Sequence, residues 1–296
     1  MKYKIEPETL SYITLEDLKN NCRVLIGLPV YNGSMESEMV KPLLSLTKMA
    51  VTHHIDIDYF FITQEALIPR GRNKIVRHFL SSPKNYTHLM FIDADVKFNE
   101  VDFFKLLYYN MDIVTAALPK KLHPTNFAIE ILLKENKEKT GSRMVATLDK
   151  RLVELKRCSL AFFLAKRRVF EEMKKAFPEL KSDACEMESQ ISIPIKNMGL
   201  SKNKEEQYRK SFDNNFYSFF DDGACRELII PDLNEKDIEK NSYLSECIVF
   251  TERWRSIGGR IWLDPRVKLG HIGKYSYEGD CMSLFPKDFQ LPEDHL

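Results

Sequence analysis

Two triplets of this sequence place carboxylates one residue apart, at Asp56 and Asp58 and again at Asp93 and Asp95. Carboxylates at this spacing can share a divalent cation and leave coordination positions open for phosphate oxygens and water. The first pair precedes most of its apolar run, whereas the second pair follows the run HLMFI. Because ligands of open parallel sheets bind beyond the carboxyl ends of the strands, we expect the cation at Asp93 and Asp95. The alternative is that these two carboxylates cap the following helix.

His271 is the candidate for a further ligand. It follows a short apolar run and lies between Gly270 and Gly273. A neutral imidazole suits a borderline cation such as Mn²⁺, provided that the fold returns this residue to the strand end that carries Asp93. Considered alone, a single histidine more often has a structural or surface role.

Several basic and polar side chains are expected at the same edge of the sheet as Asp93. The first set follows the second apolar run and consists of Arg70, Arg72, Asn73 and Lys74. The second set ends the first apolar run and consists of Pro29, Tyr31 and Asn32. Guanidinium groups bind phosphate through two hydrogen bonds, so the first set predicts an anion site, although a solvated basic face also explains it. The second set could hold a base or ribose by stacking and hydrogen bonding, or mark only a turn.

Acidic side chains in the second half of the chain are candidates for a general base. Glu246 opens an expected helix, where a carboxylate near the metal could accept a proton from an attacking hydroxyl. The helix dipole alone also favours an acid at that place. Asp221 and Asp222 are further candidates for this role. Trp254 and Trp262 have the spacing of core residues rather than of a sugar-binding platform.

The elements that would position these residues alternate between strand and helix as far as residue 118. Buried apolar runs predict strands, and apolar residues at helical spacing predict the helices between them. The expected strands are 23–33, 55–63, 87–96 and 112–118, and one of the helices between them is expected over about 72–80. Another helix follows residue 33 and requires Pro42 in its first turn. Its apolar stripe is expected to contain Val40, Leu43, Leu44, Thr47, Ala50 and Val51. This alternation indicates an α/β fold with a doubly wound, mostly parallel sheet and helices on both faces.

The second half of the chain has a mixed α+β character. Beyond Pro119, short apolar runs and a helix over 167–177 lead into a polar stretch at 178–241. That stretch is a mobile loop, an insertion or a packing arm. We expect an N-terminal extension at 1–22, two halves of one domain at 23–118 and 119–280, and a C-terminal tail at 281–296.

Composition bounds the class of protein. The 296 residues are 44% hydrophobic, which suits one large or two small globular domains, and 44 basic residues balance 43 acidic ones. Nucleic-acid binding is not expected without a basic excess. The six cysteines lack zinc spacing and indicate reduced thiols. No signal peptide and no membrane-length apolar run is present, so we expect a soluble, cytoplasmic protein.

Five segments together resemble the GT-A-fold glycosyltransferases, and are most similar to those encoded by large DNA viruses and phages. They are IGLPVYNG, PRGRNKIV, HLMFIDADV, SLAFFLAKRRVF and YLSECIVFTERWRSIGGRIWLDPRVKLGHIG. The resemblance covers roughly residues 23 to 280, and IDADV and WRSIGGRIWLDP with GHIG are its specific part.

The resemblance implies a Rossmann-like domain that binds a nucleoside-diphosphate sugar, a UDP-sugar being favoured, in its first half. Mn²⁺ or Mg²⁺ would lie between Asp93, Asp95 and His271, and Pro29, Tyr31, Asn32 and residues 70–73 would contact the donor. The second half would bind a glycan or protein acceptor, and a homo-oligomer stays open. A viral member would act in the host cytoplasm. In such enzymes the cation neutralises the leaving diphosphate.

The sequence departs from the family pattern at two places. Relatives commonly carry an acidic pair where this chain has Ser245, Glu246 and Cys247, and glycines where it has Ser159 and Ala161. A catalytically inactive relative that binds a nucleotide or glycan is therefore the main alternative. A sugar-1-phosphate nucleotidyltransferase is disfavoured, because it should open with a glycine-rich phosphate loop and this chain has GLPVYNG there. A glycoside hydrolase is disfavoured further, because its pair of carboxylates needs no basic nucleotide-binding edge.

Overall fold

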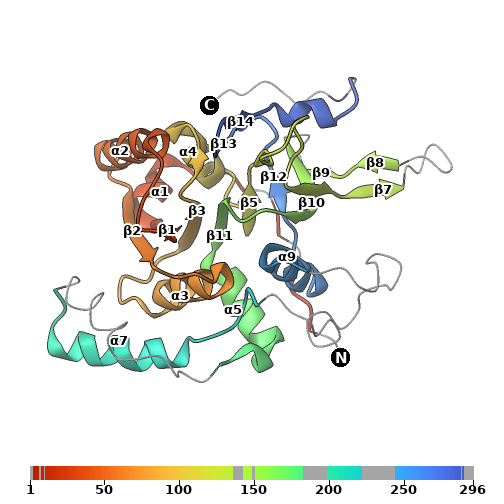
Figure 1. The fold of residues 1–296 in the computed structure, drawn as a ribbon. Coiled ribbons are helices and arrows are strands. Elements are labelled where there is room, and N and C mark those ends of the chain that lie inside the picture. The colour runs from red at the N-terminus through yellow and green to blue at the C-terminus, as the bar shows by residue number, and fades with distance from the viewer. Residues whose placement is uncertain are drawn as a thin grey trace.

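The chain alternates strands and helices through its first half and returns to the same sheet in its second half (Figure 1). The computed structural model describes residues 3–6, 8–9, 11–135, 143–148, 151–182, 199–221, 244–287 and 289. Elements of the first half are α1 (Leu15–Asn21), β1 (Arg23–Val30), α2 (Ser37–Thr52), β2 (Asp56–Thr63), α3 (Ile68–Ser81), β3 (His88–Ile92), β4 (Val96–Lys97), α4 (Glu100–Tyr108) and β5 (Ile113–Thr115). Those of the second half are β6 (Ile129–Ile131), β7 (Leu133–Glu135), β8 (Arg143–Val145), β9 (Thr147–Leu148), β10 (Leu152–Cys158), β11 (Phe162–Lys166), α5 (Arg167–Ala176), α7 (Lys202–Asn214), α9 (Glu246–Ser256), β12 (Trp262–Leu263), β13 (Gly270–Ile272) and β14 (Ser276–Glu278). Short 3₁₀ helices cover Pro178–Leu180 and Cys281–Leu284.

One mixed sheet runs through the molecule in the order β2-β1-β3-β11-β5-β12-β10-β6, with β9 paired to β10. β1 is parallel to β2 and to β3, and β5 is parallel to β12. β11 lies antiparallel between β3 and β5. The second half of the chain therefore completes the sheet that the first half begins.

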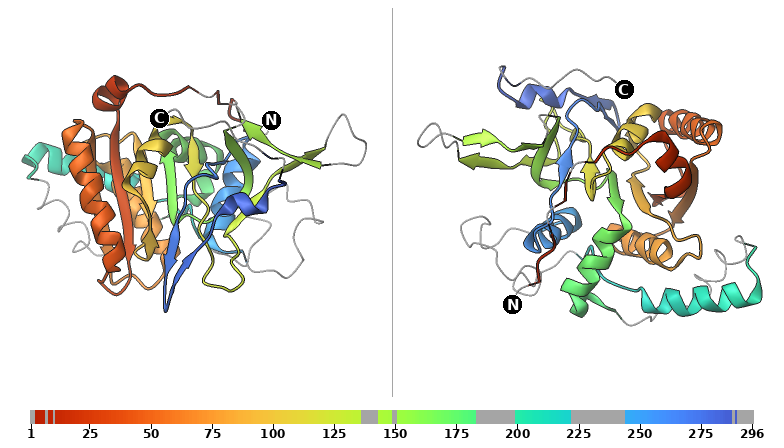
Figure 2. Two further views of the ribbon diagram at one scale, coloured as in Figure 1. Left: turned by 90° about the horizontal axis from the view of Figure 1, so that it is seen from above. Right: turned by 180° about the vertical axis from the view of Figure 1, so that it is seen from behind.

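Helices cover both faces of this sheet (Figure 2). α1, α2 and α4 bury their apolar residues in one cluster, and α3, α5 and α9 bury theirs in another. β3 contributes to both clusters, because Met90 and Ile92 point into the first while Leu89 and Phe91 point into the second. The α/β class expected from the sequence is confirmed.

α2 faces the core differently from the prediction. Its buried residues are Met39, Pro42, Leu43, Leu46 and Ala50. Leu44 and Val51, which were assigned to the apolar stripe, are 66% and 69% exposed. The helix begins at Ser37, so Pro42 lies in its second turn rather than in the first. The predicted stripe was right at Leu43 and Ala50 and wrong at Leu44 and Val51, because adjacent apolar positions fit two helical faces and only packing against β2, β4 and α4 selects one.

α3 begins earlier than the predicted residue 72. Pro69 lies in its first turn, where a missing N–H costs no helical hydrogen bond. The helix therefore starts at Ile68, and residues 70–74 belong to its body rather than to a loop. This places Arg70 and Lys74, four residues apart, on one side of the helix and Arg72 on another.

The N-terminal extension is tied to the edge of the sheet opposite the carboxyl ends of β1 and β3. Glu8 accepts hydrogen bonds from the indole Nε1 of Trp262 at 2.8 Å and from the backbone N–H of Asp112 at 2.5 Å. The backbone N–H of Ile5 donates to the carbonyl of Ile257, just after α9, and that of Ile13 donates to the carbonyl of Tyr108, the last residue of α4. Burial, followed by the charge of Asp112, raises the pKa of Glu8 to about 7.

α7 lies within the predicted polar insertion and packs against α3 as a separate arm (Figure 1). Tyr208 donates or accepts a hydrogen bond with His78 at 2.8 Å, and the fully buried Arg77 lies over the Phe212 ring at 3.7 Å. Part of the insertion is thus a packing arm. Its residues 183–198 and 222–241 lie outside the described part of the chain.

Two expectations from composition can be compared with the described part of the chain. No helix there is long and apolar enough to cross a membrane. Four cysteines carry free thiols: Cys22, Cys158, Cys247 and Cys281. Cys185 and Cys225 lie outside the described residues.

Candidate functional site

The candidate site lies where the parallel strands β1, β2 and β3 end. Because these strands run in the same direction, the residues after Val30, Thr63 and Ile92 meet at one edge of the sheet. The backbone N–H of Gln64 donates to the carbonyl of Tyr31 at 3.0 Å, and that of Glu36 donates to Ala94 at 3.2 Å. The loop after β1 is therefore held directly against the Asp93–Asp95 turn.

Arg72 connects two of the acidic candidates at this edge. Its Nη2 donates to both carboxylate oxygens of Asp93, at 2.9 and 3.1 Å. Its Nε lies 3.8 Å from Oε1 of Glu246 and has no hydrogen-bond partner among the described residues. The side chain is only 2% exposed and its guanidinium lies over the Phe91 ring at 5.0 Å. Arg72 is thus a buried cation between Asp93 and Glu246.

Glu246 is brought to the site by the start of α9. It is the first residue of that helix, and its side chain remains 20% exposed. The neighbouring thiol of Cys247 is 3.0 Å from the hydroxyl of Ser245. Burial and then the charge of Glu246 raise the pKa of Cys247, so this residue does not replace a second acid. Among these three residues, the carboxylate of Glu246 is the group suited to accept a proton.

Asn73 holds the other described acidic candidate. Its Nδ2 donates to Oδ1 of Asp221 at 3.1 Å, and its Oδ1 accepts from the backbone N–H of Phe220 at 3.3 Å. α3 therefore fixes residues 220–221 through Asn73. Asp222 lies outside the described residues.

Asp95 and His271 meet although they are 176 residues apart in the chain. Oδ2 of Asp95 is 3.2 Å from Nε2 of His271, because β13 pairs with β4 and sets His271 opposite Val96. Nδ1 of His271 is 2.8 Å from the carbonyl of Pro119. The carbonyl of Pro119 and the carboxylate of Asp95 are both acceptors, so each ring nitrogen of His271 faces an acceptor, and a cation bound between Asp95 and His271 would replace the Nε2 contact.

Lys121 also contacts this pair and was not foreseen from the sequence. Its Nζ lies 2.6 Å from Oδ2 of Asp95. Burial alone would raise the pKa of Asp95, but the hydrogen bonds from His271 and Lys121 outweigh it and lower this pKa to about 2. No spacing signal separates Lys121 from Lys120 in the segment PKKLHP.

The predicted cation ligands can be tested against these contacts. Two neighbouring ligands of one ion lie about 3 Å apart when each is about 2.1 Å from it, which matches the 3.2 Å between Asp95 and His271. Asp93 is instead committed to Arg72, and no cluster of three His, Cys, Asp or Glu side chains arranged for a metal is found in the part that the structure describes. The residues fit a cation held by Asp95 and His271, with phosphate oxygens and water completing its coordination.

Arg70 and Lys74 are held by a residue that the sequence interpretation missed. Nη2 of Arg70 is 2.7 Å from Oε1 of Glu65, and Nζ of Lys74 is 2.8 Å from Oε2. Burial favours the protonated acid, but the hydrogen bonds from Arg70 and Lys74 outweigh it and lower the pKa of Glu65 to about 2. These two cations form a cluster separate from Arg72, which could have been found only from the position of Glu65 just before the helix.

The predicted base-binding residues differ in their exposure. Pro29 is buried within β1, beside Ile62 of β2. Tyr31 is 61% exposed at the end of that strand. Oδ1 of Asn32 accepts hydrogen bonds from the backbone N–H and hydroxyl of Ser34, at 3.2 and 2.8 Å. Tyr31 is therefore available for stacking, whereas Asn32 shapes the turn.

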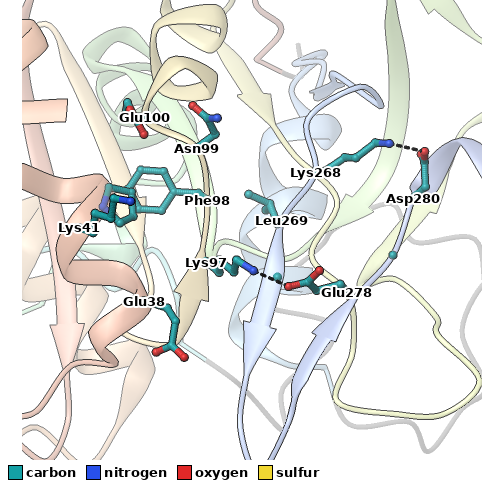
Figure 3. A pocket seen from close by; sticks show the side chains of 13 residues that line it. Glu38, Lys41, Lys97, Phe98, Asn99, Glu100, Lys268, Leu269, Glu278 and Asp280 are labelled. Atoms are coloured by element: carbon teal, nitrogen blue, oxygen red, sulfur yellow. Dashed lines mark hydrogen bonds and ion pairs between the residues drawn. The ribbon is translucent and has the colours of Figure 1, made fainter. Parts of the chain in front are cut away.

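A pocket of about 550 Å³ lies on the other face of the three-stranded sheet β14-β13-β4 (Figure 3). Lys97, Gly270 and Glu278 share one register row and line it, while His271 lies in the next row, whose side chains point to the opposite face. Ion pairs join Lys97 to Glu278 at 2.6 Å and Lys268 to Asp280 at 2.7 Å (Figure 3). This pocket is separate from the candidate site.

Comparisons with known proteins do not identify a family for this chain. No protein-family model matches the sequence, and no curated protein matches it. Among solved structures, the chain is similar to one titled "Crystal Structure of A197 from STIV", with 16% identity and a TM-score of 0.41. The similarity covers 85% of this chain and 86% of that one. At this TM-score the likeness supports no conclusion about function.

Proposed function

We propose that this protein is a metal-dependent glycosyltransferase that moves a sugar from a nucleoside-diphosphate donor, favouring a UDP-sugar, to a hydroxyl of a glycan or protein. The meeting of Asp95 and His271 at the carboxyl edge of the parallel strands carries the proposal. Both residues belong to the specific part of the GT-A resemblance. Arg72, Asp93 and Glu246 belong to its motifs as well and converge at the same edge.

Asp95 and His271 would hold Mn²⁺ or Mg²⁺. The bound ion would neutralise charge that develops on the diphosphate as the sugar leaves. The carbonyl of Pro119 accepts from Nδ1 of His271 and orients the ring, so Nε2, which faces Asp95, is the nitrogen that would bind the ion. Asp93 acts through Arg72, whose position it fixes with two hydrogen bonds. Tyr31 would stack on the nucleobase at the end of β1.

Glu246 would serve as the general base if the reaction inverts the configuration of the sugar. The bond from the anomeric carbon to the diphosphate oxygen breaks and a bond to the acceptor oxygen forms. The proton of the acceptor hydroxyl passes to the carboxylate of Glu246. Asp221, held by Asn73, is the other described carboxylate at the site that could accept it. A reaction with retention requires no such base.

The test is thermal unfolding of the protein with Mn²⁺ and a panel of nucleoside diphosphates. A ligand that binds only the folded state raises the unfolding midpoint by mass action. We expect a rise of several degrees with one nucleotide, dependent on Mn²⁺ and lost in Asp95→Ala. Asp93→Asn should weaken it less, because Asp93 contacts Arg72. Asp56→Ala is the matched control, since Asp56 is an exposed residue at the opposite end of its strand.

An absence of any nucleotide effect on folded protein would reject the proposal. Equal losses in Asp95→Ala and Asp56→Ala would reject the assignment of the site. Nucleotide binding without transfer to any acceptor would favour a catalytically inactive binding protein, and glycan binding would then be screened.

A further inference from the structure

Lys121 binds the carboxylate oxygen of Asp95 that a cation between Asp95 and His271 would use. Its ammonium lies 2.6 Å from Oδ2 of Asp95, the same oxygen that faces Nε2 of His271 at 3.2 Å. A positive charge beside the carboxylate of Asp95 stabilises its ionised form. The side chain of Lys121 is 38% exposed, so its long stem can swing away from the pair.

One short loop both orients the imidazole and supplies this ammonium. The carbonyl of Pro119 accepts from Nδ1 of His271, and Lys121 follows two residues later. The loop is closed by backbone hydrogen bonds from Lys120 to Asn126 at 2.7 Å and from Ala128 to Leu118 at 2.9 Å. The backbone of Lys121 is therefore fixed, and only its side chain has to move when the charge at the site changes.

Gly273 makes room for the stem of Lys121. A Cβ at position 273 would lie 3.1 Å from Cδ and 3.3 Å from Cε of Lys121. The backbone of Gly273 is outside the left-handed region, so alanine is acceptable there apart from this contact. Substitution of Gly273 therefore offers a way to disturb the lysine without removing its charge.

We propose that Lys121 is a built-in counter-ion that a divalent cation must displace from Asp95, and that the released ammonium then binds the donor diphosphate. This inference rests on the proposed function. A unit charge and a divalent ion on one carboxylate repel each other, so the metal alone binds weakly. A diphosphate accepts both cations and removes the conflict. Metal and nucleotide therefore bind cooperatively, and the coupling is reciprocal.

The experiment is calorimetric titration of Mn²⁺ into the full chain, with and without saturating UDP. Lys121→Met keeps the length of the stem and removes the charge. We expect it to tighten the binding of Mn²⁺ alone by about tenfold, from the repulsion removed at an exposed, partly screened site. Gly273→Ala should change the affinity in the same direction by less. With saturating UDP, Lys121→Met should no longer bind Mn²⁺ more tightly than the wild type, because the ammonium of Lys121 is then missing as a partner of the diphosphate.

Lys274→Met is the matched control. It removes one positive charge from the neighbouring β13–β14 turn, where Nζ lies over the Tyr275 ring at 5.9 Å. Its Mn²⁺ affinity should equal that of the wild type. Unchanged or weaker binding of Mn²⁺ alone in Lys121→Met, with the wild type still binding Mn²⁺ and UDP together, would overturn this inference alone. If neither protein binds Mn²⁺ in either condition, both the inference and the proposed function are wrong.

Discussion

Replacing Arg72 with methionine tests whether this buried cation organises the site. The arginine donates two charge-assisted hydrogen bonds to Asp93 and lies 3.8 Å from Glu246, with only 2% of its side chain exposed. Removing one partner of a buried pair costs about 3–5 kcal/mol. Asp93 and Glu246 are 26% and 20% exposed, so water stabilises them in part. We therefore expect a loss of about 2–3 kcal/mol in the free energy of unfolding.

The measurement is urea denaturation of Arg72→Met, of Asp93→Asn and of the double variant. If the arginine and the carboxylate stabilise each other, the double variant should be more stable than the two single losses predict, by about 1–2 kcal/mol. Arg72→Met also removes the guanidinium from above the Phe91 ring, but this loss occurs in both the single and the double variant, so the comparison isolates the pairing with Asp93. Additive losses, or a cost below about 0.5 kcal/mol for Arg72→Met, would refute the view that this contact positions the site.

Two further substitutions separate the roles of Glu246 and Glu8. Glu246→Gln should leave nucleotide binding intact and lower the transfer rate by 10²-fold or more, on the order expected for a general base. Transfer at the wild-type rate would exclude Glu246 from this role. The raised pKa of Glu8, about 7 against an ordinary 4.5, means that the folded state holds the proton more tightly. Wild-type stability should therefore fall relative to Glu8→Gln as the pH rises from about 4.5 to about 7, by up to about 3 kcal/mol. The measurement is chemical denaturation of both proteins across this pH range. If the free energies of unfolding of the two proteins change in parallel with pH, Glu8 does not have a raised pKa.

Much of the arrangement of strands could be predicted from local pattern. Runs of apolar residues mark strands buried on both faces, because such strands need apolar side chains at every position. The end of the run HLMFI was enough to select Asp93 and Asp95 over Asp56 and Asp58 as candidates. The structure places Asp93 and Asp95 at the carboxyl edge of the parallel strands, and Asp56 begins β2 at the opposite edge.

Pattern was insufficient wherever two faces or two partners competed. The predicted apolar face of α2 wrongly included Leu44, because Leu43 and Leu44 are both apolar and only contact with the sheet decides which one is buried. The segment SLAFFLA is one of the short apolar runs beyond Pro119, but the antiparallel place of its strand β11 between β3 and β5 depends on strands distant in the chain. Periodicity describes one element at a time and carries no information about its neighbours in the sheet.

The sequence by itself determined the α/β class, the edge where the parallel strands end and the residue types present there. Only the tertiary structure decided which charges pair: Arg72 with Asp93, Arg70 and Lys74 with Glu65, and Lys121 with Asp95. The reason is physical. Secondary structure follows from short-range preferences that are written in consecutive residues, whereas an ion pair depends on distances of a few ångströms between side chains from separate elements. Those distances exist only after the sheet and its helices have packed.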